Sequence, residues 1–244
     1  MIAIMKAEHL KLAHSFSRKV PLAVSILTLS LALFLTLGIY AAFPAGAWNW
    51  WYTLMMHGML AIFCYFSIKK DKKIHYYHSL SLSVTPEKCW LGKIMYCVPM
   101  LFLSNLLIFI GTFLGGMILG TTVPTENGLT GAVLLGITCL WEIPFFLFLS
   151  AKLGMSGAVI TGIVLPLAAV AGIADTPFWW VCPAAVPMRL MCPVLGILPN
   201  GLLIEPDNLL NDPNVILPGI LLSLLWFVLL TFATALWFQR KESV

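Results

Sequence analysis

Residues 69–93 of the chain, KKDKKIHYYHSLSLSVTPEKCWLGK, form its one long polar stretch between two apolar ones and hold six of the 14 Lys and Arg residues. On each side lies an apolar run of about 20 residues, the length that crosses the hydrocarbon core of a bilayer. Two such runs joined by a polar loop predict a pair of membrane-spanning helices. Because basic loops stay on the cytoplasmic side, we expect this loop to face the cytoplasm.

The composition excludes a soluble protein. The chain has 244 residues, of which 60% are hydrophobic and only 10% are charged, whereas soluble domains carry about 25% charged residues. So few charges cannot cover a surface that faces water, which predicts a membrane protein with several helical spans. The net charge of +4 does not indicate nucleic-acid binding, because the basic residues lie beside apolar runs, where they orient a membrane protein.

The apolar runs predict an all-α membrane protein, with residues 1–244 forming one transmembrane domain. The predicted membrane-spanning helices are 20–43, 49–68, 94–119, 129–150, 155–173 and 215–238. Residues 1–19 predict an amphipathic helix that lies along the lipid headgroups, and the alternative is a frayed cytoplasmic tail. Its apolar face would hold Met1, Met5, Leu12 and Phe16, and its polar face Lys11, His14 and Arg18.

The distribution of basic residues predicts the orientation. With both termini in the cytoplasm, 13 of the 14 Lys and Arg residues fall on the cytoplasmic side, and only Arg189 falls outside. This obeys the positive-inside rule, so we expect a multi-pass protein of the plasma membrane.

Motifs for catalysis are absent from the sequence. It contains no G-x-x-x-x-G-K-[ST], H-E-x-x-H or G-x-S-x-G, so we expect no bound ATP, no metal, no cofactor and no catalytic residue in this chain. The cysteines show no C-x-x-C spacing, and only Cys182 and Cys192 share a predicted outer segment. Those two could form a disulfide or remain free thiols.

One carboxyl side chain and one histidine fall inside the predicted spans. Glu142 lies in the span 129–150, where a carboxyl group must be protonated, paired or next to a wet cavity. It could mark a substrate path or a subunit interface, or it could be a neutral side chain bonded to a neighbouring helix. His57 is alone in the span 49–68, and such a histidine more often donates a hydrogen bond between helices than catalyses a reaction.

The second half of the polar loop has the pattern of a helix start. Thr85 is a good N-cap, Pro86 suits the first helical position, and Glu87 would lie near the positive end of the helix dipole. Trp90 and Lys93 would then mark the membrane interface. We also expect a short helix around residues 74–82, although the lysines alone could serve only to set the topology.

Residues 174–214 are unusual for an outer loop, because they are largely apolar and carry five prolines between residues 177 and 199. They are too broken for a regular span, which favours a re-entrant or interfacial segment whose free backbone groups meet protein or water. Arg189 could bind a phosphate or carboxylate of a substrate, or its guanidinium could extend to the lipid headgroups.

Four stretches resemble the permease subunits of lantibiotic self-protection ABC transporters of the epidermin, mutacin and nisin type. They are KAEHLKLAHSFSRK at 6–19, NWWYTL at 49–54, SVTPEKCWLGK at 83–93 and WWVCPAAVPMRLMCPVLGILPNG at 179–201. The resemblance implies a type-2 ABC exporter fold. That fold has six helices, an amphipathic N-terminal helix, a cytoplasmic coupling helix between helices two and three, and a re-entrant extracellular element before helix six. His14 and Glu142 depart from the pattern of this family.

The resemblance also implies a role and partners. The chain would expel a lantibiotic from the cell membrane, together with a second homologous permease subunit and an ATPase dimer that holds ATP and Mg. The residues implied to contact the ATPase are Tyr77, Thr85, Pro86, Glu87, Lys88 and Trp90. The residues assigned to a substrate path or subunit interface are Glu142, Trp179, Trp180 and Arg189. Two alternatives remain: a type-2 permease for a drug, a lipid or a lipid-linked glycan, and an intramembrane enzyme that uses Glu142 with His57.

Overall fold

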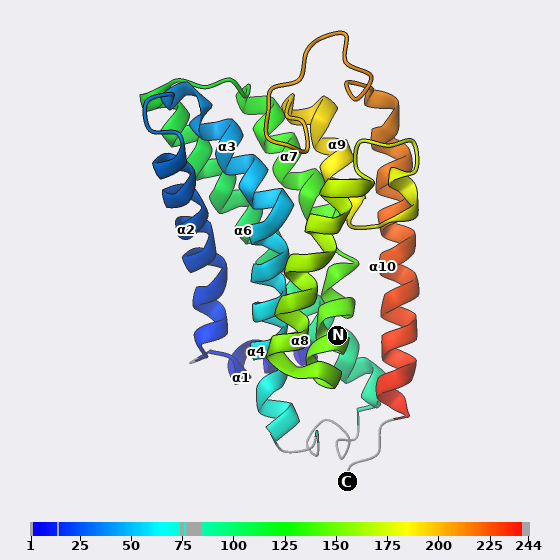
Figure 1. Cartoon of the computed structure of the whole chain (residues 1–244). Coiled ribbons are helices and arrows are strands. Elements are labelled where there is room, and N and C mark those ends of the chain that lie inside the picture. Colours follow the sequence, from blue (N-terminus) through cyan, green and yellow to red (C-terminus); the bar gives the residue numbers. More distant parts are fainter. Residues whose placement is uncertain (1, 14, 74–75, 77–83, 241–244) are drawn as a thin grey trace.

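The chain is a bundle of helices, most of which run along one axis (Figure 1). The computed structural model describes residues 2–13, 15–73, 76 and 84–240, and within these ranges it contains no strand, only one isolated bridge between Ile197 and Leu203. The helices are α1 (Ile2–Lys11), α2 (Val20–Leu35), α3 (Phe43–Trp50), α4 (Met56–Lys73), α6 (Pro86–Leu119), α7 (Thr125–Thr138), α8 (Glu142–Gly172), α9 (Ala185–Leu195) and α10 (Ile216–Gln239). The all-α prediction is confirmed.

Five of the described helical runs are long and apolar enough to cross a membrane. They are Phe16–Leu35, Tyr40–Lys73, Pro86–Leu119, Glu142–Gly172 and Pro213–Gln239. Their outward faces expose large apolar side chains, such as Leu221, Val228 and Phe232 along α10. Apolar faces of this extent are stable against lipid rather than water, so the chain is a multi-pass membrane protein.

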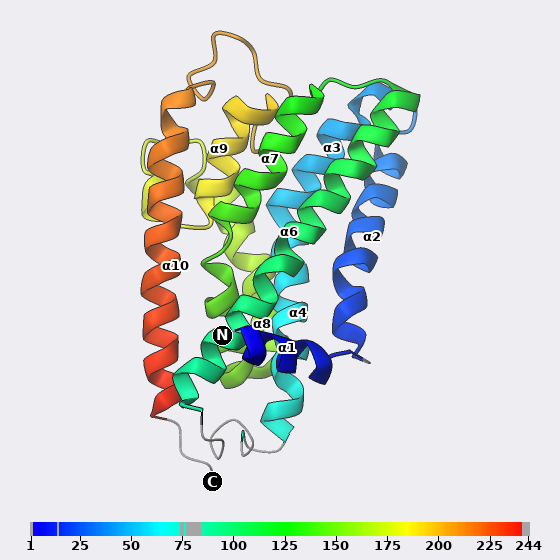
Figure 2. The ribbon, with the colours of Figure 1, turned by 180° about the vertical axis from the view of Figure 1, so that it is seen from behind.

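The two ends of the bundle differ. Helix α1 lies across the end of the bundle at which α10 ends, called here the lower end, as Figures 1 and 2 show from opposite sides. The short helix α9 and the segment that joins it to α10 lie at the upper end. Helix α4 ends and helix α6 begins at the lower end.

Helix α8 is two helices that meet at Gly154. This residue has φ 77° and ψ −164°, which is not helical, and such a positive φ favours glycine. A Cβ atom at Gly162 would lie 3.3 Å from Cζ of Phe146, although 16 residues of straight helix would separate the two by about 24 Å. The segments Glu142–Leu153 and Met155–Gly172 therefore pack against each other as a hairpin. The predicted turn between the spans 129–150 and 155–173 lies at this place.

The predicted span 129–150 is interrupted. Helix α7 ends at Thr138, and α8 begins at Glu142, so residues 139–141 leave the helix. Pro144 stands in the first turn of α8, where the missing N–H of proline costs no hydrogen bond. The interruption therefore lies just before Pro144, at the junction of α7 and α8.

The loop within residues 69–93 is shorter than the sequence predicts, because helices occupy both ends of this stretch. Helix α4 continues to Lys73, where lysines in its last turn interact favourably with the helix dipole. Helix α6 begins at Pro86, and the extended backbone of Thr85 precedes it, although the Thr85 side chain makes no capping hydrogen bond. The predicted helix at 74–82 lies outside the described residues except for Tyr76.

Close packing of glycine joins α4 to the hairpin of α8, and this contact yields a prediction. A Cβ at Gly162 would lie 3.1 Å from the carbonyl oxygen of His57 and 3.2 Å from Cβ of Ala61, whereas a Cβ at Gly58 on α4 would meet nothing within 4 Å. We expect Gly162→Ala to destabilise the protein by about 1–3 kcal/mol, because overpacking forces the helices apart. Gly58→Ala is the control and should leave stability unchanged or slightly raised. Thermal unfolding of both variants in detergent micelles tests this, and equal midpoints would contradict it.

Candidate functional site

Four charged side chains form one cluster at the lower end. The Nζ atom of Lys93 on α6 lies 2.9 Å from Oε2 of Glu8 on α1, and it also pairs with Asp71 on α4. The Nζ atom of Lys11 lies 2.9 Å from Oε1 of Glu8 and 2.7 Å from Oδ1 of Asp71. Two cations thus meet two carboxylates, and the cluster fastens α1 to both α4 and α6.

This cluster corrects the expected role of Lys93. The sequence placed Lys93 at the membrane interface, but its side chain is 0% exposed and makes both of its ion pairs inside the protein. A buried ammonium group is tolerated only where carboxylates compensate it. Glu8 and Asp71 provide that compensation, and no local sequence pattern predicts the pair of Glu8 with Lys93, because the two are 85 residues apart.

The face of α1 that packs on the bundle includes Glu8 and Lys11 of this cluster as well as apolar residues. Leu12 is buried as expected, whereas Phe16, assigned to the same apolar face, is exposed. Phe16 belongs to a short 3₁₀ helix after α1, which breaks the helical spacing from which that face was predicted. Met1 and His14 lie outside the described residues.

Trp90 joins two helices rather than facing the membrane interface. Its indole Nε1 donates a hydrogen bond of 3.0 Å to Oγ1 of Thr234, and its ring stacks on Phe238 with centroids 4.8 Å apart. The side chain is fully buried. The prediction that Trp90 marks the interface is therefore wrong, because packing against the end of α10 takes the ring out of contact with lipid and water.

The other residues assigned to an ATPase contact lie near the lower surface. All four stand at the start of α6, where Thr85 and Lys88 are exposed and Pro86 and Glu87 are half-buried. Tyr77 lies outside the described residues. Its neighbour Tyr76 is buried beside Phe238, and this burial, with the nearby carboxylate of Asp71, raises the pKa of Tyr76 to about 12.

An apolar groove runs along α10 from the start of α6. It has a volume of about 390 Å³, and Glu87 and Leu91 line its α6 side. Phe227, Val228, Thr231, Phe232, Ala235 and Leu236 line its α10 side. A groove with such apolar walls is suited to contact with lipid.

His57 and Glu142 meet inside the bundle. The Nδ1 atom of His57 lies 2.7 Å from Oε1 of Glu142, and its Nε2 atom lies 2.8 Å from the carbonyl oxygen of Tyr52. Both residues are 1% exposed. Of the alternatives open for Glu142, the structure thus shows a bond to a neighbouring helix, and His57 bridges helices as expected.

Arg189 is buried on α9. It is 5% exposed, and its Nη1 donates a hydrogen bond of 2.6 Å to the carbonyl oxygen of Leu210. In this position it holds the segment after α9 and extends neither to lipid headgroups nor to the surface. Trp179 is half-buried and Trp180 is exposed, and no described contact joins either of them to Glu142. Cys182 and Cys192 are free thiols.

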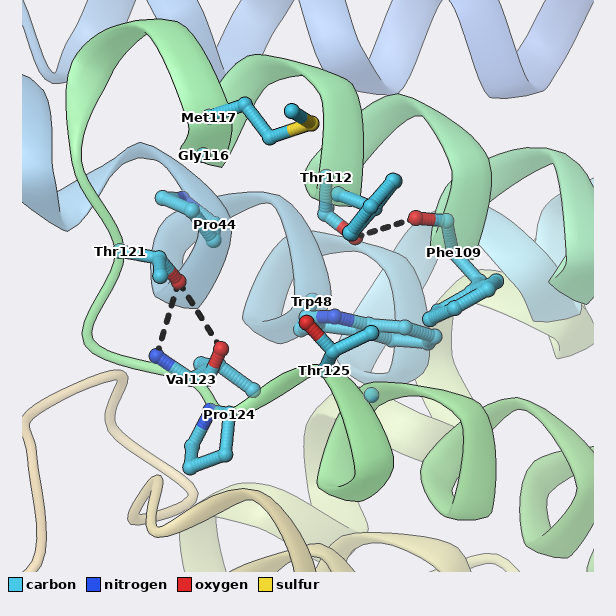
Figure 3. A pocket seen from close by; sticks show the side chains of 12 residues that line it. Pro44, Trp48, Phe109, Thr112, Gly116, Met117, Thr121, Val123, Pro124 and Thr125 are labelled. Atoms are coloured by element: carbon cyan, nitrogen blue, oxygen red, sulfur yellow. Dashed lines mark hydrogen bonds between the residues drawn. The ribbon is translucent and has the colours of Figure 1, made fainter.

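A pocket of about 100 Å³ opens at the upper end between α3, α6 and the turn that leads to α7 (Figure 3). The indole of Trp48 forms one wall, and Phe109, Met117 and Pro124 form others. The Oγ1 atom of Thr121 accepts a hydrogen bond of 3.0 Å from the Val123 N–H, which shapes the rim. The pocket is large enough for one small apolar group. Sequence reasoning did not find it, since its lining comes from separate helices.

Comparisons of the chain with protein families, with curated proteins and with solved structures found no match.

The lower-end cluster predicts a large effect of removing its buried cation. We expect Lys93→Met to lower the free energy of unfolding by about 3 kcal/mol or more, because Glu8 and Asp71 would then share only Lys11. Lys88→Met, five residues earlier on the same helix and exposed, is the matched control and should change stability by less than about 0.5 kcal/mol. Unfolding in mixed micelles of mild detergent and dodecyl sulfate measures both. A small effect of Lys93→Met would mean that the cluster contributes little.

Proposed function

We propose that the chain is the permease subunit of an ABC transporter that expels a lantibiotic or similar antimicrobial peptide from the plasma membrane, giving self-immunity or resistance. The proposal rests on the resemblance of four stretches of sequence. One structural observation supports it: the order of the helices and of the apolar segment along the bundle. Helix α1, the end of α4 with its lysines and the start of α6 lie together at the lower end, and the broken apolar segment with α9 lies at the upper end just before α10.

In this proposal the chain crosses the membrane six times. The crossings are α2, the run from α3 to α4, α6, the run from α7 to Leu153, the run from Met155 to Gly172, and α10. The lower end faces the cytoplasm, because it holds nearly all of the basic residues. Helix α1 then lies along the inner headgroups, fixed by its ion pairs to Asp71 and Lys93.

The lower end would receive the ATPase dimer, which would bind ATP and Mg. The exposed start of α6, with Glu87 and Lys88, offers charged side chains to such a partner. Movement of this start would reach α10 through Trp90 and Thr234, and it would reach α1 and α4 through Lys93. Helices joined in this way shift as rigid bodies, which is how alternating access is commonly produced. A second, homologous permease subunit would complete the transporter.

The upper end would meet the peptide. The pocket beside Trp48 accepts a small apolar group, and Phe178, Trp180 and Val181 expose apolar side chains before α9. An amphipathic peptide in the outer leaflet could use both features. A drug, a lipid or a lipid-linked glycan shares that amphipathic character, so a permease for one of these remains the alternative.

An intramembrane enzyme is a further candidate, favoured by the contact of His57 with Glu142. Both side chains are 1% exposed, so a substrate would reach them only after α4 and α8 had separated. Full transport or resistance by a Glu142→Gln variant would exclude this candidate.

The start of α6 offers a test of the ATPase contact. We expect Glu87→Lys to weaken the complex with an ATPase encoded next to the chain by about tenfold, since charge reversal at an interface opposes binding. Glu126→Lys is a matched control, because Glu126 stands in the first turn of α7 at the opposite end. Co-purification and peptide resistance of an isogenic strain measure the effect. Absence of any complex with the wild-type chain would refute the proposed function.

The substrate class needs a separate measurement. A strain lacking the chain should become more sensitive to one or a few lantibiotics and keep its sensitivity to unrelated drugs. Unchanged sensitivity to all lantibiotics, together with an intact ATPase complex, would favour the alternative permease.

A further inference from the structure

Two irregular backbone segments meet halfway along the bundle. The π-helix Trp51–Met55 lies within the run Tyr40–Lys73, and His57 follows it, 17 residues after Tyr40 and 16 before Lys73. The break between α7 and α8 lies opposite, and Glu142 is the first residue after it. π-Helical turns and interrupted membrane helices occur frequently at functional sites. The hydrogen bond between His57 and Glu142 joins these two irregularities.

The geometry determines how many protons the pair holds. The carbonyl oxygen of Tyr52 can only accept a hydrogen bond, so the Nε2 atom of His57, 2.8 Å away, must carry a hydrogen. The 2.7 Å contact between Nδ1 and Oε1 of Glu142 must hold one more hydrogen, on either atom. Whether the pair is a neutral histidine with a carboxylic acid or an imidazolium with a carboxylate, its net charge is zero and it keeps one titratable proton.

No larger ligand fits this contact. Both side chains are 1% exposed, and the described residues include no group of three or more His, Cys, Asp and Glu that could hold a metal ion. The second carboxyl oxygen of Glu142, Oε2, has no hydrogen-bond partner among them. A carboxylate that lost the shared proton here would be charged, buried and incompletely bonded, which is strongly unfavourable.

We propose that His57 and Glu142 form a proton-binding site, filled while α4 and α8 are packed together and emptied when their contact opens. This inference does not depend on the proposed export function. In water, a separated histidine loses its second proton near pH 6.5 and a glutamic acid near about pH 4.3. Above about pH 6.5 the separated pair therefore holds no titratable proton, whereas the packed pair holds one.

The sign of the pH dependence follows from this count. Above about pH 6.5 the packed state binds one proton more than the separated state, so its stability falls as pH rises. Between about pH 4.5 and pH 6.5 both states hold one proton, and the pair adds no pH dependence there.

Other titratable groups near the pair do not obscure this window. Tyr52, Cys64 and Cys139 interact with the pair, Cys97 lies behind Cys64, and Cys192 faces Tyr52. Thiols and phenols in water ionise at about pH 8.5 and above. The other histidines contribute equally to the wild type and to variants that retain them, so a comparison removes their contribution to the pH dependence. Measurements between about pH 6.5 and pH 8 thus report mainly on the pair.

The test compares unfolding of the wild-type chain and Glu142→Gln in mixed micelles. Glutamine keeps the size and a hydrogen bond to Nδ1 but cannot titrate. The unfolding equilibrium constant of the wild type should rise more steeply with pH than that of Glu142→Gln, by about tenfold per pH unit toward pH 8. Equal slopes for the two proteins would overturn the proposal.

If Glu142→Gln does not fold, a second variant and a second measurement still test the proposal. The double variant His57→Leu with Glu142→Leu replaces a buried polar pair by apolar side chains, which is often neutral or stabilising. It should show the same shallow slope as Glu142→Gln. Protons released on unfolding can also be counted directly with a pH indicator in weak buffer. Release of less than about half a proton by the wild-type chain near pH 7.5 would refute the site without any variant.

Discussion

A bilayer offers no water to bare peptide groups, and this constraint explains both the regular and the irregular parts of the molecule. The described segments that are long and apolar enough to cross a membrane are helical, with their peptide groups bonded internally. Three described departures from regular helix have a polar side chain bonded to the backbone. The ring of His57 meets the Tyr52 carbonyl in the π-helix, the amide of Asn49 meets the carbonyls of Leu198 and Pro199, and Arg189 meets the carbonyl of Leu210. Two buried polar residues, His57 and Arg189, thus bond backbone carbonyls where the regular helix pattern is interrupted.

One turn of α6 organises the lower end. Trp90 and Lys93 are three residues apart and therefore lie on one face of the helix. Trp90 binds the end of α10 through Thr234 and Phe238, and Lys93 binds α1 and α4 through Glu8 and Asp71. Helices from the beginning, middle and end of the chain are therefore held by a single turn. The polar stretch that begins at Lys69 matters less for its lysines than for this turn at its far end.

Apolar runs, the helix start at Pro86 and the turn near Gly154 could be predicted from sequence, because each depends on residues close together in the chain. The partners of Glu142 and Lys93 could not, since His57 and Glu8 each lie 85 residues away from the residue they bind and Asp71 lies 22 residues from Lys93, and one sequence does not reveal which helices are neighbours. Trp90 shows the same limit. An aromatic residue next to a lysine at the end of an apolar run is typical of a membrane interface, yet packing against α10 buries it. Residues 139–141 gave no pattern that distinguishes an interrupted helix from a continuous one.

The wide separation of these partners has a consequence for biogenesis. The chain enters the membrane from its N-terminus, so α4 is in place long before α8 has been made, and His57 then has no Glu142 to bind. Glu8 and Asp71 likewise have only Lys11 until α6 arrives with Lys93. Early helices must therefore remain at the insertion machinery, or next to water, until later ones neutralise them. A chain that stops before α8 would carry an unpaired polar group in the bilayer, which quality-control proteases could recognise.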